Sequence, residues 1–105
     1  MKIEKKNRLE KAGFRIGSAE ELLNLTPEEA TLVNMRLALA GAVRGRRARL
    51  GFSQSELARR LGSSQSRVAK IEAGESNVSF DLLVRAMLAT GAKRSEVGQA
   101  IAAGK

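Results

Sequence analysis

The sequence predicts an all-α fold. Four serine or threonine residues stand where they can cap the start of a helix, and each segment that follows ends near a glycine. The caps are Thr26, Ser53, Ser64 and Ser79, and the glycines are Gly51, Gly62, Gly74 and Gly91. Apolar residues between each cap and glycine recur at helical spacings. We expect helices from about residue 27 to 50, 54 to 61, 65 to 73 and 80 to 90.

Residues 1–25 form an N-terminal extension ahead of the strongest helix signals. Lysine and glutamate are mixed through residues 1–12, where we expect only partial order. Residues 14–17 alternate apolar with polar side chains between two glycines, a pattern typical of a very short β-strand. Ser18 then begins a helical turn that is expected to bury Leu22 and Leu23.

The segment from Thr26 to Glu29 is the clearest helix start in the chain. It combines a threonine cap, a proline at the first helical position and a glutamate at the third. The helix should continue to about Leu50. Its apolar residues occupy more than one face, and they are Leu32, Val33, Met35, Leu37, Leu39 and Val43. We therefore expect contact both with the helical core and with a second surface, for which a subunit interface is the first candidate.

Two short helices separated by a tight turn are predicted over residues 53–74. Ser53 and Glu56 have the spacing of a capping box, and Gly62 supplies the left-handed position that ends the first helix. Val68 and Ile71 give the second helix its inner face. This arrangement is a helix-turn-helix, a motif whose second helix enters the major groove of DNA.

The outer face of the second helix carries side chains suited to DNA. A glutamine amide can donate and accept together, which matches adenine in the major groove, so we expect Gln65 to read a base. Arg67 could contact guanine or hold a phosphate. Gln54 begins the first helix, where side chain and helix amides can bind a phosphate oxygen. The predicted DNA-binding residues are Gln54, Ser64, Gln65, Ser66, Arg67 and Lys70.

The remaining residues complete the core and form a tail. The helix capped by Ser79 is expected to supply core side chains from Leu82, Leu83, Ala86, Met87 and Leu88. Residues 93–105 look like a short, weak helix capped by Ser95, with Val97 and Ile101 four residues apart. We therefore divide the chain into an extension over residues 1–25, a DNA-binding domain over 26–92 and a tail over 93–105.

Composition and charge narrow the classes of function. The 105 residues suffice for one domain with extensions. Cysteine is absent, which excludes disulfides and thiolate metal sites, and no cofactor is predicted. Neither a membrane segment nor a signal peptide is apparent, so we expect a cytoplasmic protein without a membrane partner. Of the net charge of +8, a balance of +7 lies between residues 44 and 70, which favours binding to a polyanion.

Other classes of function fit the sequence less well. An enzyme would have to use glutamates or Asp81, the only aspartate, and the paired glutamates at residues 20–21 and 28–29 are explained by helix-dipole stabilisation. RNA recognition usually needs stacking aromatics, and the chain has three phenylalanines as its aromatic residues. The alternative that remains is a protein-interaction module of the same fold without DNA binding.

Residues 50–92 resemble the XRE, or phage-repressor-like, helix-turn-helix family. They read LGFSQSELARRLGSSQSRVAKIEAGESNVSFDLLVRAMLATGA. The resemblance implies a five-helix domain over roughly residues 30–92 and a dimeric repressor on an inverted-repeat operator. It also implies a phosphate contact by Gln54, a base contact by Gln65, and an ion pair between Arg47 and Glu72 beneath the second helix.

The preceding flank, residues 13–40, is similar to the N-terminal extension of small stand-alone XRE regulators, including HigA-type antitoxins. Its sequence is GFRIGSAEELLNLTPEEATLVNMRLALA. The similarity implies a dimer that represses its own operon and binds a RelE-like toxin. A plain repressor without a toxin partner is the alternative.

Overall fold

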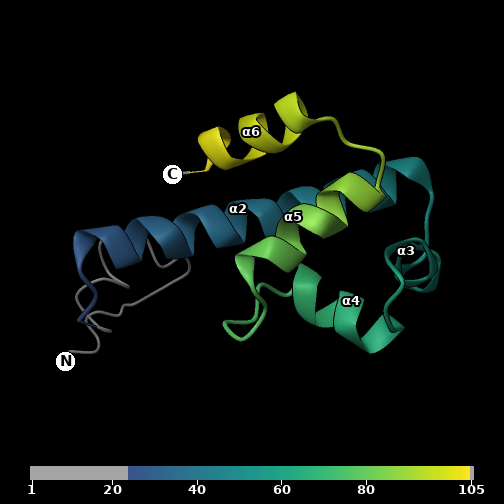
Figure 1. The fold of residues 1–105 in the computed structure, drawn as a ribbon, viewed down its shortest axis with the longest axis horizontal. Helices are drawn as coiled ribbons and strands as arrows, with labels where there is room; N and C mark the ends of the chain where they lie inside the picture. The colour runs from purple at the N-terminus through teal and green to yellow at the C-terminus, as the bar shows by residue number, and fades with distance from the viewer. Residues whose placement is uncertain (1–23, 105) are drawn as a thin grey trace. The chain divides into compact units, whose positions relative to one another are not determined.

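The computed structural model describes residues 24–104, and these residues contain five helices and no strand. The helices are α2 (Pro27–Leu50), α3 (Gln54–Leu61), α4 (Gln65–Glu72), α5 (Phe80–Ala89) and α6 (Arg94–Ala103) (Figure 1). The all-α prediction is confirmed. The short strand predicted at residues 14–17 and the helical turn from Ser18 lie outside the described residues. Among those described, no helix combines the length and the apolar character that crossing a membrane would require.

The start of α2 confirms the predicted cap. The Thr26 backbone N–H donates to Glu29 Oε1 at 2.9 Å, and the Glu29 backbone N–H donates to Thr26 Oγ1 at 3.1 Å. Each side chain thus satisfies a backbone donor that the first helical turn leaves exposed. The chain divides into two structural units within α2, between Asn34 and Met35.

Serine caps also begin α3 and α4. Ser53 Oγ accepts the Glu56 backbone N–H at 3.0 Å, and Ser64 Oγ accepts the Arg67 backbone N–H at 3.1 Å. The reciprocal half of the capping box predicted for Glu56 is wrong, because its carboxylate accepts from two guanidinium groups of the same helix. Hydrogen bonds to a charged donor are stronger than those to a neutral backbone amide.

The C-terminal helices follow the prediction except at the start of α6. Ser79 Oγ accepts the Leu82 backbone N–H at 3.0 Å and so caps α5. The predicted cap at Ser95 is wrong, because α6 already begins at Arg94. The Glu96 carboxylate provides the cap by accepting the Lys93 backbone N–H at 2.7 Å. Val97 is buried and Ile101 packs against the core.

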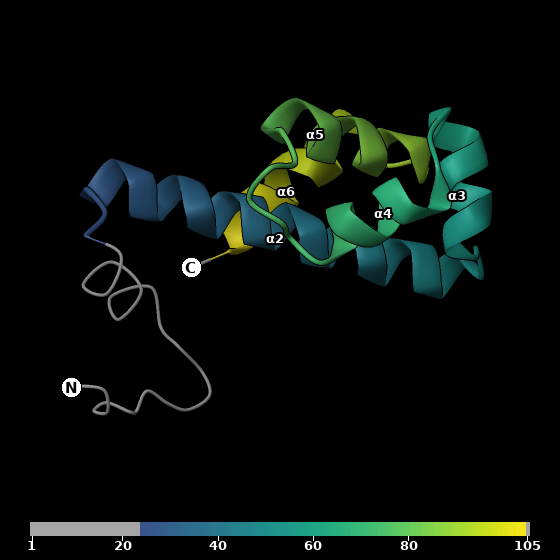
Figure 2. The same ribbon diagram turned by 90° about the horizontal axis from the view of Figure 1, so that it is seen from below.

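The core lies where α3, α4 and α5 meet the C-terminal half of α2. In the view of Figure 2, α4 lies between α5 and α2. The largest fully buried side chains are Leu39, Val43, Leu57, Val68, Ile71, Leu83 and Met87. Leu88 was expected in the core but is 48% exposed, because the inner face of α5 passes through Leu83, Ala86 and Met87. One residue further along a helix turns the side chain about 100° off that face.

Alanine at Gly62 or Gly74 is expected to lower the free energy of unfolding by about 1–2 kcal/mol, because both glycines adopt the left-handed backbone conformation. A Cβ at Gly74 would lie 2.8 Å from Leu37 Cδ2, whereas one at Gly62 would meet nothing within 4 Å. Leu37 is half exposed and can rotate away, so the losses should be similar in urea unfolding.

The control is Gly41→Ala in the middle of α2, where an added Cβ meets no atom within 4 Å. This variant should raise the free energy of unfolding by about 0.5–1 kcal/mol, because alanine favours the helical conformation more than glycine does. Unchanged stability in Gly62→Ala would contradict the assigned backbone strain.

Candidate nucleic-acid interface

The second helix of the motif, α4, exposes the side chains predicted to contact DNA. Gln65, Ser66, Arg67 and Lys70 are exposed, while Val68 and Ile71 are fully buried on the opposite face. This division follows from helical spacing, which puts residues three apart on one side. The structure therefore brings the predicted residues of α4 onto one outward surface.

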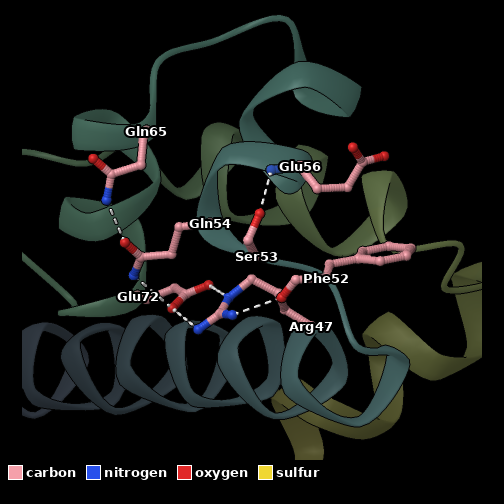
Figure 3. Close-up of polar contacts among 7 residues, drawn as sticks. All are labelled: Arg47, Phe52, Ser53, Gln54, Glu56, Gln65 and Glu72. Atoms are coloured by element: carbon pink, nitrogen blue, oxygen red, sulfur yellow. Dashed lines mark hydrogen bonds and ion pairs between the residues drawn. The ribbon is translucent and has the colours of Figure 1, made fainter.

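A chain of polar contacts connects α4, the second helix of the motif, to α2 (Figure 3). Arg47 Nε donates to Glu72 Oε2 at 2.5 Å, and Arg47 Nη2 donates to Glu72 Oε1 at 2.9 Å. Arg47 Nη1 also donates to the Phe52 carbonyl at 2.8 Å. The ion pair that the family resemblance implied is confirmed, and it is bidentate, the geometry in which arginine binds a carboxylate most strongly.

Gln54 continues this chain to the outer surface. Its Nε2 donates to Glu72 Oε1 at 3.1 Å, and its Oε1 accepts from Gln65 Nε2 at 2.6 Å (Figure 3). An amide nitrogen carries two N–H groups, so Gln65 retains one N–H and its carbonyl oxygen for a ligand. Those two groups are the pair that adenine requires in the major groove.

The link between Gln54 and Gln65 was missed from sequence. The two glutamines were predicted separately, as a phosphate contact and a base contact. Each is the first residue of its helix, and the turn of residues 62–64 between α3 and α4 brings those two helix starts together. The signal that could have revealed it is a short helix that begins with one glutamine and is joined by a tight turn to a second helix that also begins with a glutamine.

Burial and charge act in opposite directions on Glu72, whose side chain is 3% exposed. Burial alone would raise the pKa of Glu72, but hydrogen bonds from Arg47 and Gln54 outweigh it. Nearby positive charge adds to this effect, so the pKa of Glu72 lies below its ordinary value of 4.5. The hydrogen bond between Arg47 and Glu72 correspondingly raises the pKa of Arg47. The buried pair is therefore fully ionised at neutral pH.

The lowered pKa of Glu72 predicts that the folded protein loses stability in acid. A carboxyl group with a depressed pKa stabilises the fold above its unfolded pKa, and the contribution is lost as the pH falls through the folded pKa. Between pH 7 and 4.5 the contribution of Glu72 should stay nearly constant, and below pH 4.5 it should decline. Urea unfolding of the wild type and Glu72→Gln, followed from pH 7 to below pH 4.5, should show a smaller loss of stability in acid for the variant. Parallel curves would contradict the ionised pair.

The serines at the start of α4 already make contacts within the protein. Ser64 Oγ already accepts the Arg67 backbone N–H and lies 3.2 Å from Ser66 Oγ. Ser64 therefore has a structural role as the cap of α4. Its predicted contact with DNA stays a prediction, as do the contacts of Ser66, Arg67 and Lys70.

Four of the eight basic residues between residues 44 and 70 make contacts within the protein. Arg46 is half-buried and donates to Thr90 Oγ1 at 2.8 Å on the α5–α6 turn. Arg59 and Arg60 share the Glu56 carboxylate, and Arg60 lies 4.1 Å from the centre of the Phe52 ring. With Arg47 in the buried pair, the exposed positive side chains of this segment outside these contacts are Arg44, Arg49, Arg67 and Lys70.

Comparison with known proteins agrees with this geometry. A family model described as helix-turn-helix matches residues 43–97, more than half of the chain. The matched segment contains α3, α4 and α5 whole, together with the last two turns of α2 and the start of α6. No curated protein and no solved structure matches the chain. The chain belongs to the XRE-like helix-turn-helix family of DNA-binding domains.

Proposed function

We propose that this protein is a transcriptional repressor that recognises a specific DNA sequence. The observation that supports the proposal best is the exposed Gln65 amide at the start of α4. Gln54 orients this amide, and Gln54 is itself held by the buried pair of Glu72 and Arg47. A base contact requires a side chain held in one orientation, and this chain of contacts provides it.

Each predicted residue has a place in the proposed complex. Gln65 reads an adenine, and Arg67 contacts a guanine or a phosphate. Ser64, Ser66 and Lys70 add further contacts to DNA. Gln54 contacts a backbone phosphate as well as Gln65, which fixes the register of the motif on the duplex. No step in this proposal is catalytic.

The proposed active form is a homodimer on an inverted repeat. Family membership supports it, together with leucines that are about half exposed on two helices: Leu37 and Leu50 on α2, and Leu88 on α5. Two copies of α4 would enter successive major grooves, with half-sites about one helical turn, ~10 bp, apart. Sedimentation with and without DNA tests the assembly, and a mass of one chain in both cases would refute it.

A second role is proposed from the flank of the domain. Residues 13–40 are similar to the extension of HigA-type antitoxins, which supports binding to a RelE-like toxin and repression of the operon encoding both. Co-expression with a RelE-like ribonuclease from the neighbouring gene tests this role. Rescue of growth supports it, and unrelieved toxicity together with normal DNA binding would leave a plain repressor.

The DNA-binding proposal is tested by selecting sites from a random duplex library with the full-length chain. The expected result is an enriched inverted repeat in which the wild type prefers adenine at one position. Gln65→Ala should no longer prefer adenine at that position. Recovery of no common sequence would oppose specific recognition and favour the alternative, an interaction module of the same fold.

A further inference from the structure

Arg36, on α2, binds the loop that follows α4, the proposed recognition helix. Its Nη2 donates to the backbone carbonyls of Glu75 at 3.3 Å and Ser76 at 3.0 Å, and also to that of Val78. These three carbonyls belong to residues 73–79, which join α4 to α5. Arg36 lies outside the family-matched segment of residues 43–97.

The same loop packs against the neighbouring residue of α2. A Cβ at Gly74 would lie 2.8 Å from Leu37 Cδ2 and 3.7 Å from Ala40 Cβ, so the loop backbone closely approaches α2. Val78 is buried, and its backbone N–H donates to the Glu75 carbonyl at 3.1 Å. Residues 75–77 are exposed, so the loop has few apolar contacts of its own beyond Val78.

A short hydrogen-bonded path joins Arg36 to the last turn of the recognition helix. Arg36 holds the Glu75 carbonyl, and the Glu75 backbone N–H donates to the Lys70 carbonyl at 3.3 Å. The next bond in this turn runs from the Gly74 backbone N–H to the Ile71 carbonyl at 3.1 Å. These are terminal carbonyls of α4, which a helix leaves without intrahelical partners. The position of the loop therefore determines how the end of α4 is held.

The recognition helix is only eight residues long, so both of its ends determine its orientation. The Gln54 contact holds its N-terminal end, and the Arg47–Glu72 pair and the loop together hold its C-terminal end. A loop fixed by few apolar contacts opens easily unless charged hydrogen bonds hold it. The charged guanidinium group of Arg36 supplies such bonds through its Nη2 atom.

We propose that Arg36 is a positioning residue for DNA recognition: by binding the loop of residues 73–79, it holds the C-terminal end of α4 against α2. This inference rests on the proposed DNA-binding function. It assigns Arg36 no contact with DNA, so Arg36 should affect the preference for one sequence over another but not the electrostatic attraction to DNA. Loss of Arg36 should reduce discrimination between sequences without changing the number of phosphates neutralised.

The test compares Arg36→Gln, Arg36→Lys and Arg46→Gln in the full-length chain. Arg46 is the matched control, because it lies on the same helix and donates to the Thr90 carbonyl at 3.5 Å, in the turn between α5 and α6. Two quantities are measured well below the unfolding temperature of every variant. The first is hydrogen exchange at the Glu75 and Val78 amides, and the second is affinity for selected and scrambled duplexes over a range of salt concentrations.

The expected result for Arg36→Gln is about tenfold faster exchange at the two loop amides, as a locally opened segment gives. We expect its ratio of selected to scrambled affinity to fall roughly five- to tenfold with an unchanged salt slope. Arg36→Lys should lie between this variant and the wild type, because an ammonium group keeps the positive charge and the N–H donors but ends a shorter side chain. Arg46→Gln should match the wild type in both measurements.

Three results would overturn the inference. Unchanged loop exchange in Arg36→Gln would show that the loop does not depend on Arg36. Faster exchange with an unchanged affinity ratio would show that the loop does not position α4 for recognition. A salt slope reduced by about one would make Arg36 a phosphate contact instead. If the wild type prefers no sequence, the proposed function fails and the recognition role fails with it, while the exchange data still decide whether Arg36 holds the loop.

Discussion

Glu72→Ala is expected to lower the free energy of unfolding by roughly 3–5 kcal/mol, because it leaves the Arg47 guanidinium without its partner inside the protein. The side chains are 3% exposed for Glu72 and 18% exposed for Arg47, so water can compensate little. The substitution also removes the acceptor of the Gln54 amide. Urea unfolding at neutral pH measures the loss.

Glu56→Ala is the matched control for this prediction. Glu56 also accepts from arginines, but Arg59 and Arg60 have side chains that are 71% and 43% exposed. Exposed ion pairs contribute about 0–1 kcal/mol, so this variant should remain close to the wild type. If Glu72→Ala unfolded at the same urea concentration as Glu56→Ala, the pair beneath α4 would not stabilise the fold as described.

Gln65→Ala is expected to relax discrimination at one base pair of the operator by about 1–3 kcal/mol, the amount that a bidentate contact contributes. Gln65 is exposed and its side chain caps no helix, so stability should change little. Competition binding against duplexes that vary one base pair at a time measures the effect. The loss of discrimination should be confined to a single position, because one side-chain amide forms hydrogen bonds to one base.

The control for this experiment is Gln99→Ala, which removes an exposed glutamine from α6. This variant should bind every duplex as the wild type does. An equal loss of affinity for all duplexes in Gln65→Ala would assign Gln65 to the DNA backbone. Unchanged binding would remove it from the interface.

The elements of the fold that depend on neighbouring residues could be predicted from the sequence. Thr26, Ser53, Ser64 and Ser79 each cap a helix as expected, since capping involves residues three apart in the chain. The inner faces of α3 and α4 also followed from helical spacing. The pair of Arg47 and Glu72 came from the family resemblance, because nothing local identifies partners 25 residues apart.

The features that were missed depend on competition or on distant contacts. Glu56 could have closed a capping box, but charged donors within its own helix compete for its carboxylate. Ser95 could have capped α6, but Glu96 begins the helix earlier. The contacts of Arg36 span about 40 residues of chain, and those of Arg46 up to 50, so only the folded structure reveals them.

The most direct test of sequence-specific DNA binding is a salt-titrated binding curve of the full-length protein. The duplex comes from upstream of its own gene, and a scrambled duplex of equal length and composition is the comparison. Specific recognition predicts tighter binding to the upstream duplex at every salt concentration, with both affinities falling as salt rises. Failure to bind either duplex, even at low salt, would contradict the account and support the interaction module.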